Sequence, residues 1–180
     1  MNARQTTWPK TWLMTDERLG DRMWEAIDRL PAGSGIVFRH YSLPNAERAS
    51  LAIEIAGFCR ERAFTLAVAG DAGLAVEVGA DLIHNPTAST ELPYSRAVHS
   101  IAEAEAAAAE DPSLVFVSPI FATSSHPGQE PLGRDLAAQI AEAARAPAIA
   151  LGGMDARRFA QLKGFYGWAG IDAWLGTEES

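Results

Sequence analysis

Short apolar segments alternate with helix-like segments about eight times along this chain. Alternation of this kind, with short connections, builds a parallel sheet that is covered by helices. The apolar segments predict buried strands, and the segments between them predict helices. The expected strands are 11–14, 35–38, 65–69, 82–83, 96–98, 114–117, 148–151 and 169–173, and the expected helices are 21–30, 45–62, 72–78, 100–110, 136–144 and 155 to about 163.

About eight strands predict a closed TIM (β/α)8 barrel, with a doubly wound sheet as the alternative. The chain has 180 residues, which is short for a barrel, because such domains usually take about 250 residues. We expect the shortening in two places. Residues 87–94 are too few and too proline-broken for a full helix, and nothing after Gly176 can form a last helix. No linker or low-complexity tract divides the sequence, so one domain is expected over residues 1–180.

The charge and composition limit the kinds of partner and the location that are expected for this protein. A formal net charge of −8 argues against an extended surface for nucleic acid or anionic membrane, although a small phosphorylated ligand needs only a local site. No signal-peptide pattern and no bilayer-spanning apolar run is present, so a cytoplasmic protein is expected. The single cysteine, Cys59, cannot form an internal disulfide, and its apolar neighbours favour core packing over a reactive thiol.

Polar residues follow most of the predicted strands. In a barrel the carboxyl ends of the strands meet on one face, where ligands bind. That face is expected to bring together Arg39, Asp71, His84, His99, Ser118, Thr123, Ser125, His126, Gly152 and Gly153. The histidines do not have metal-ligand spacing, so no metal site is predicted. No nucleophile elbow, Walker loop or dinucleotide fingerprint is present either.

Several of these residues allow two interpretations. The Gly152–Gly153 pair, directly before a helix, either presents amide N–H groups to a phosphate or only forms a tight turn. Arg39 is either a phosphate clamp or a surface cation. His84 is a hydrogen-bonded structural residue or a ligand contact, and His99 either caps the following helix or faces the pocket. His126 is either exposed or in contact with the ligand.

Six motifs follow one another in order: WLMTDE (12–17), GIVFR (35–39), DAGLAVEVGADLIH (71–84), AVHSIAEAEAA (97–107), VSPIFATSSHPG (117–128) and ALGGM (150–154). Along nearly its whole length the chain thereby resembles the thiamine-phosphate synthase/TenI family. The third motif is the most detailed match, and ALGGM is similar to the family's phosphate-binding AIGGI. The resemblance implies a TIM barrel. Synthases of the family join a pyrimidine pyrophosphate to a thiazole phosphate with magnesium and release pyrophosphate, whereas TenI members isomerise the thiazole phosphate.

The resemblance also implies roles for single residues. Thr123, Ser125 and His126 would hold the pyrophosphate with help from Arg39, and Gly152–Gly153 would hold the thiazole phosphate. An imidazole, that of His99 or His126, would act as general acid or base in an isomerase.

Departures from the family pattern fall on the metal and pyrophosphate site. The family's two metal-binding aspartates align with Ala69–Gly70 and near Ser89, and Asp71 lies one place further on. Val37 and Tyr41 stand at the glutamine and lysine of the QxRxK motif, and His126 stands at a second lysine. Pro119 occupies the place of the isomerase histidine, and Trp174–Leu175 the place of a valine–serine pair in the phosphate cup. No cofactor is therefore assigned, and Mg²⁺ is only what the resemblance implies.

Three functions follow as hypotheses. The first is a thiamine-phosphate synthase-like transferase of thiamine biosynthesis with a degenerate metal and pyrophosphate site. The second is a TenI-like thiazole phosphate isomerase, and the third is a non-catalytic barrel that binds a thiazole or thiamine phosphate. In each case the partner is a small phosphorylated thiazole or pyrimidine ligand, with no nucleic acid or membrane. A homodimer is expected, because the missing last helix leaves faces that need cover.

Overall fold

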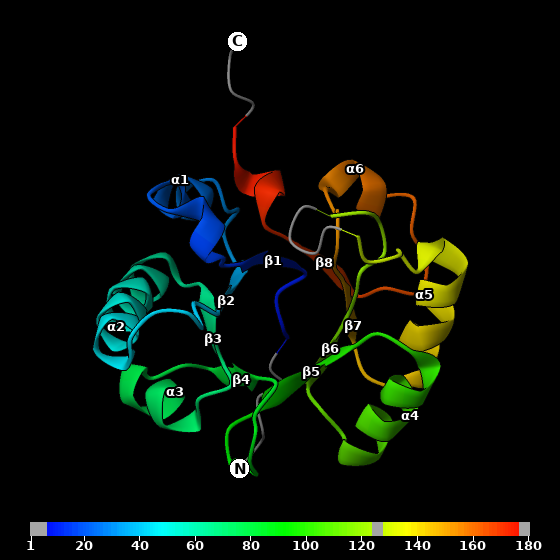
Figure 1. The fold of residues 1–180 in the computed structure, drawn as a ribbon, viewed down its shortest axis with the longest axis horizontal. Coiled ribbons are helices and arrows are strands. Elements are labelled where there is room, and N and C mark those ends of the chain that lie inside the picture. The colour runs from blue at the N-terminus through cyan, green and yellow to red at the C-terminus, as the bar shows by residue number, and fades with distance from the viewer. Residues whose placement is uncertain (1–6, 124–127, 177–180) are drawn as a thin grey trace.

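The computed structural model describes residues 7–123 and 128–176, and they form a closed barrel of parallel strands surrounded by helices (Figure 1). The strands follow chain order around the ring, and β1 closes it by pairing with both β2 and β8. The predicted TIM-type barrel is confirmed, and the doubly wound alternative is excluded. The strands are β1 (Thr11–Met14), β2 (Gly35–Phe38), β3 (Thr65–Ala69), β4 (Leu82–His84), β5 (Tyr94–Val98), β6 (Leu114–Val117), β7 (Ala148–Ala150) and β8 (Gly167–Gly170).

The helices lie on the outside of the ring, between consecutive strands (Figure 1). Asp71, Ser100 and Asp155 cap three of them, each by accepting a hydrogen bond from a backbone N–H in the first turn. The helices are α1 (Arg22–Asp28), α2 (Asn45–Arg62), α3 (Ala72–Val78), α4 (Ile101–Glu110), α5 (Gly133–Ala143) and α6 (Ala156–Phe159), with 3-10 turns η1 (Glu17–Leu19) and η2 (Asp172–Trp174).

The barrel is shortened where the sequence predicts it. Among the described residues no helix lies between β4 and β5, and only the turn η2 follows β8. Several other boundaries differ from the prediction by one to four residues. Strand β5 begins at Tyr94 rather than 96, and helix α5 begins at Gly133 rather than 136. Helix α6 ends at Phe159 rather than near 163, and β8 covers Gly167–Gly170 rather than 169–173.

The early start of β8 has a tertiary cause. Trp168 donates its N–H to the Lys10 carbonyl oxygen at 2.8 Å, next to β1. Gly167 passes so close to the same residue that an added Cβ would lie 2.2 Å from that oxygen. A Gly–Trp pair carries little strand signal of its own, so its pairing with the first strand decides the boundary.

Aromatic side chains fill the interior of the ring. Trp12 and His84 each meet Phe116 edge to face, with ring centroids 5.8 and 5.0 Å apart. The Trp12 indole is fully buried, and its Nε1 donates to the Pro9 carbonyl at 2.7 Å. Cys59 is buried against the barrel, and this burial raises its thiol pKa to about 12. The prediction of core packing for Cys59 is confirmed.

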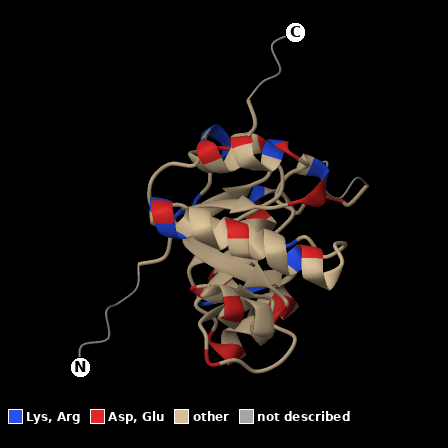
Figure 2. Ribbon diagram, turned by 90° about the vertical axis from the view of Figure 1, so that its left-hand side faces the viewer, with Lys and Arg blue, Asp and Glu red and all other residues tan. Residues whose placement is uncertain are grey.

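Charged residues are distributed over the outside of the molecule. Figure 2 shows acidic and basic residues of one side mainly on helices and loops, with the strands behind them largely uncharged. In the described part of the chain, no helix combines the length and the apolar character that crossing a bilayer requires.

The close contact between β1 and β2 gives the first prediction. A Cβ added to Gly35 would lie 2.2 Å from Cε3 of Trp12, and the buried, hydrogen-bonded indole has no room to move. Replacing Gly35 with alanine should lower the free energy of unfolding by about 1–3 kcal/mol, measured by urea denaturation. The matched control is Gly57→Ala in α2, where nothing lies within 4 Å. The free energy of unfolding of Gly57→Ala should rise by about 0.5–1 kcal/mol, because alanine favours the helix over glycine. A Gly35→Ala protein as stable as the parent would contradict the packing described.

Candidate active site

A cavity of about 800 Å³ opens where the strands end and their loops begin. This size suits a small phosphorylated ligand. The wall comes from the ends of β1 and β2 and from the loops after β5, β6, β7 and β8. It includes Met14, Arg39, His99, Ser118, Thr123, Leu151, Gly152, Gly153, Arg158, Ile171 and Asp172.

The structure brings together most of the residues predicted to form the site. Arg39, His99, Thr123 and the Gly152–Gly153 pair all line the cavity. Ser125 and His126 lie outside the described residues, so their predicted contacts stay predictions.

The Gly152–Gly153 turn packs tightly under the loop that follows β6. Both residues have positive φ, +94° and +60°, and added Cβ atoms would lie 2.6 Å from Pro119 Cα and 2.5 Å from the Ala122 carbonyl oxygen. The carbonyl of Gly152 accepts a hydrogen bond from Phe121 N at 3.1 Å. Within residues 7–123 and 128–176, neither glycine N–H donates a hydrogen bond. The pair therefore forms a required tight turn, and its N–H groups stay without an acceptor among the described residues.

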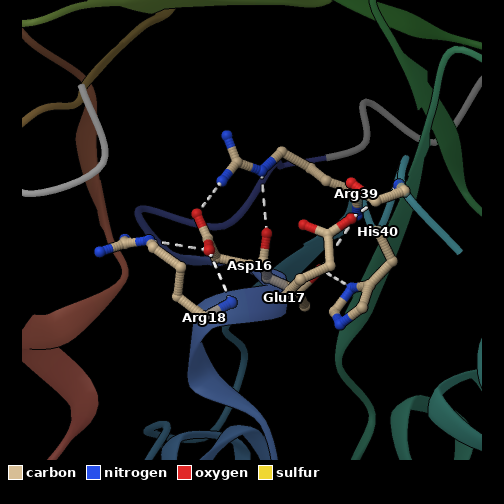
Figure 3. A network of polar contacts seen from close by, with 7 residues as sticks. Asp16, Glu17, Arg18, Arg39 and His40 are labelled. Atoms are coloured by element: carbon tan, nitrogen blue, oxygen red, sulfur yellow. Dashed lines mark hydrogen bonds and ion pairs between the residues drawn. The ribbon is translucent and has the colours of Figure 1, made fainter.

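Arg39 is held in place by Asp16, at the adjoining ends of β1 and β2. Figure 3 shows the guanidinium groups of Arg39 and Arg18 approaching the Asp16 carboxylate from different sides. The Arg39 Nη2 and Arg18 Nε each lie 2.9 Å from a carboxylate oxygen, and Arg39 Nε donates to the Thr15 carbonyl at 2.8 Å. Burial alone would raise the pKa of Asp16, but the bonds and charges of Arg18 and Arg39 outweigh it and lower the pKa. Arg39 is thus an oriented cation whose charge Asp16 partly offsets.

Further contacts hold the segments after β1 and β2 together. The Thr15 hydroxyl accepts a hydrogen bond from Arg39 N and lies 3.0 Å from His40 Nδ1. His40 is buried, and this burial lowers the pKa of its imidazole. Glu17 accepts a hydrogen bond from Ser42 N at 2.9 Å. Neither Asp16 nor His40 was predicted as a site residue, although polar residues follow the first strand at 15–17 and the second strand at 39–41.

His99 lines the cavity rather than capping α4, whose N-terminal cap is Ser100. Its backbone N–H donates to the Glu103 carboxylate at 2.8 Å, which supports the start of α4. Its ring Nδ1 lies 2.7 Å from the Ser118 carbonyl oxygen. A carbonyl only accepts, so Nδ1 carries the proton, and the neutral ring then has its acceptor at Nε2. The cavity wall therefore holds an oriented imidazole that can take up a proton.

His84 is a core residue and does not line the cavity. Its side chain is buried among the strands, with Nδ1 2.9 Å from the Ser95 hydroxyl and its ring against Phe116. Complete burial lowers the pKa of His84 to about 3. These contacts match the structural interpretation, whereas the ligand contact also predicted for His84 has no counterpart in this geometry.

Asp71, the carboxylate nearest in sequence to the family's metal position, already has partners within the protein. Asp71 accepts a hydrogen bond from Leu74 N at 2.9 Å and lies 3.5 Å from Nη1 of the buried Arg48. Arg48 also donates to the carbonyls of Ala69 and Arg39 at 2.8 and 3.1 Å. No three His, Cys, Asp or Glu side chains of the described residues gather as a metal site. Magnesium favours carboxylate and water oxygens, so these residues do not fit it, and Arg48 supplies a positive charge there instead.

Comparison with known proteins identifies the family. The sequence pattern of the family described as "Thiamine monophosphate synthase" matches residues 13–173, a range that includes nearly all of the barrel. The chain belongs to this family. The expected assignment is confirmed, and with it the context of thiamine biosynthesis.

Individual relatives agree with this assignment. The chain is 29% identical to "Putative thiamine-phosphate synthase 2" of Aquifex aeolicus, over 93% of this chain and 98% of the relative. It is 32% identical to the thiamine-phosphate synthase of Methanoculleus marisnigri, over 84% of this chain and 79% of the relative. A solved structure of thiamine phosphate pyrophosphorylase from Pyrococcus furiosus superposes with a TM-score of 0.77 at 22% identity, over 94% of this chain and 89% of that one. At that identity, the likeness supports the fold alone.

The burial of His84 gives a prediction about pH. The folded protein keeps this imidazole neutral down to a pKa of about 3, whereas the unfolded chain takes up a proton near the ordinary value of 6.5. The stability contributed by the neutral ring is fully present above pH 6.5 and is lost as the pH falls toward 3. The free energy of unfolding should fall by up to about 1.4 kcal/mol per pH unit from this one group.

The variant His84→Gln tests this origin of the pH dependence. It should be less stable than the parent near neutral pH, because it disturbs the buried contact with Ser95. Its stability should then fall less steeply toward acid, as followed by urea denaturation at several pH values. Equal slopes for parent and variant would show that His84 is not responsible. His40 is present in both proteins, so its own lowered pKa does not affect the comparison.

Proposed function

We propose that this protein is a thiamine-phosphate synthase-like transferase that binds a thiazole phosphate and carries an altered, magnesium-independent pyrophosphate site. The observation that carries the proposal is the cavity of about 800 Å³ at the strand ends of a barrel of this family. Its wall combines N–H donors of Gly152–Gly153 with an oriented arginine, Arg39. A ligand with a phosphate at one end and an apolar ring at the other fits this combination.

The wall of the cavity offers two kinds of chemistry. The Gly152–Gly153 amides would bind the phosphate, whereas Met14 and Leu151 offer apolar contact for a ring. In a synthase reaction the leaving pyrophosphate must be stabilised electrostatically. Arg39 would assist this departure, but Asp16 already takes part of its charge, and the described residues offer no metal group. We therefore expect slow product formation that does not depend on added magnesium.

Binding and turnover can be tested together. Thiazole phosphate at about 100 times its dissociation constant should stabilise the fold by about 2.7 kcal/mol, a rise in melting temperature of roughly 5–10 °C. The matched control is the same thiazole alcohol without its phosphate, which should shift the melting temperature much less. Thiamine phosphate formation from the two substrates is then measured with magnesium and with a chelator. No shift with thiazole phosphate, thiamine phosphate or pyrophosphate would contradict the proposal. Binding of thiazole phosphate without product formation at high protein concentration would refute the transferase and support a non-catalytic, ligand-binding barrel.

The oriented imidazole of His99 favours one second candidate, an isomerase acting on thiazole phosphate. Its Nε2 acceptor lies on a ring that lines the cavity, as a general base requires. His99→Gln should abolish metal-independent isomerisation while leaving thiazole phosphate binding within about threefold. Isomerisation that persists in His99→Gln would exclude this mechanism for His99. The cytoplasmic location and the homodimer predicted from the sequence remain predictions, as does the lack of nucleic-acid partners.

A further inference from the structure

Two arginines line the cavity, and they differ in how far the protein itself uses their charge. Arg39 is paired with Asp16 at 2.9 Å. Arg158, in the short helix α6, forms no ion pair within the described residues. Arg158 is therefore the cavity arginine whose positive charge remains for a ligand.

Arg158 is also held in a defined place. Its Nη1 donates to the carbonyl oxygen of Gly153, and its guanidinium carbon lies 5.0 Å from the ring centroid of Phe121. The Gly153 carbonyl belongs to the tight turn, and Phe121 belongs to the loop that covers this turn. The guanidinium thus sits beside the Gly152–Gly153 amides. In the part of the chain that the structure describes, its Nε and Nη2 donate to no acceptor.

We propose that Arg158 is the side chain that binds the phosphate group of the ligand in this cavity. This inference rests on the proposed function and gives it a residue that the sequence analysis did not name. A planar guanidinium with N–H groups to spare binds a phosphate through charge-assisted hydrogen bonds. The neighbouring glycine amides would complete the site from the backbone side.

The charges of the wall also indicate the class of ligand. Asp155 and Asp172 line the cavity together with Arg39 and Arg158, so the described wall has no excess of positive charge. Asp155 accepts a hydrogen bond from the backbone N–H of Arg158 at 2.7 Å, which directs it toward α6. A wall of this kind suits one phosphate monoester better than a pyrophosphate, which carries more charge in a similar volume.

The test compares two neighbouring arginines. Arg158→Gln removes the cation beside the Gly152–Gly153 turn from the cavity. Arg157→Gln makes the same change at an exposed residue of α6 that does not line the cavity. Calorimetric titration with inorganic phosphate, thiazole phosphate and pyrophosphate gives the affinities. Arg158→Gln should weaken binding of phosphate and thiazole phosphate about tenfold or more, and Arg157→Gln should bind as the parent does. Arg158→Lys, which keeps the charge but loses the planar fork, should fall in between.

The outcomes separate the inference from the proposed function. Equal affinity for thiazole phosphate in Arg158→Gln and Arg157→Gln would overturn the role of Arg158 while leaving the proposed function intact. Binding of inorganic phosphate that depends on Arg158, without any binding of thiazole phosphate, would support the residue and refute the proposed ligand. A parent protein that binds neither would overturn both. Pyrophosphate bound more tightly than thiazole phosphate would overturn the assignment to a monoester.

Discussion

Closure of the ring between β1 and β8 is the constraint on which the rest of this small barrel depends. On each of the two strands that flank β1, one position has no room for a Cβ. Gly35 passes against the indole of Trp12, and Gly167 passes against the backbone of Lys10. Trp12 can then fill the interior and meet Phe116 across the ring. These contacts pack both flanking strands tightly against β1, within the closed ring that the chain of 180 residues forms.

The same principle builds the site at the carboxyl end of the ring. The Gly152–Gly153 turn lies so close to the loop after β6 that neither position has room for a Cβ. Hydrogen bonds from Ile120 and Phe121 to the β7 loop fix the two loops together. The wall of the cavity is therefore rigid on this side before any ligand arrives. Rigid placement of N–H donors is what an anion site needs, because the donors then require no reorganisation on binding.

The sequence predicted those features that depend on local pattern. Alternating apolar and helical segments predicted the barrel, and the expected helices that start at 72, 100 and 155 begin within one residue of α3, α4 and α6. The glycine pair, Arg39 and His99 were predicted to meet because parallel strands end on one face, and they do line one cavity.

Features that depend on contacts distant in sequence were missed. The start of β8 is decided by its pairing with Lys10, at the other end of the chain. Arg158 could not be recognised, because its place on the cavity wall follows from α6 being short and lying against Phe121. The sequence left the place of His84 open between the core and the ligand, and its core position is decided by Phe116 and Ser95, which belong to two other strands. Burial by partners from elsewhere in the chain leaves no periodic signal around the residue itself.

Internal ion pairs neutralise two acidic side chains at the strand ends of this barrel. Asp16 after β1 and Asp71 after β3 each have an arginine as counter-charge, Arg39 in one case and Arg48 in the other. A partly buried carboxylate is costly unless it is paired, and a metal ion or a guanidinium can meet that need. A metal ion also accepts oxygen ligands from a substrate, whereas Arg48 has its donors on the Ala69 and Arg39 carbonyls and on Asp71. The two arginines therefore hold these carboxylates at the strand ends, and the donors of Arg48 are committed to the protein itself, whereas Arg158 in α6 keeps N–H groups that no described residue uses.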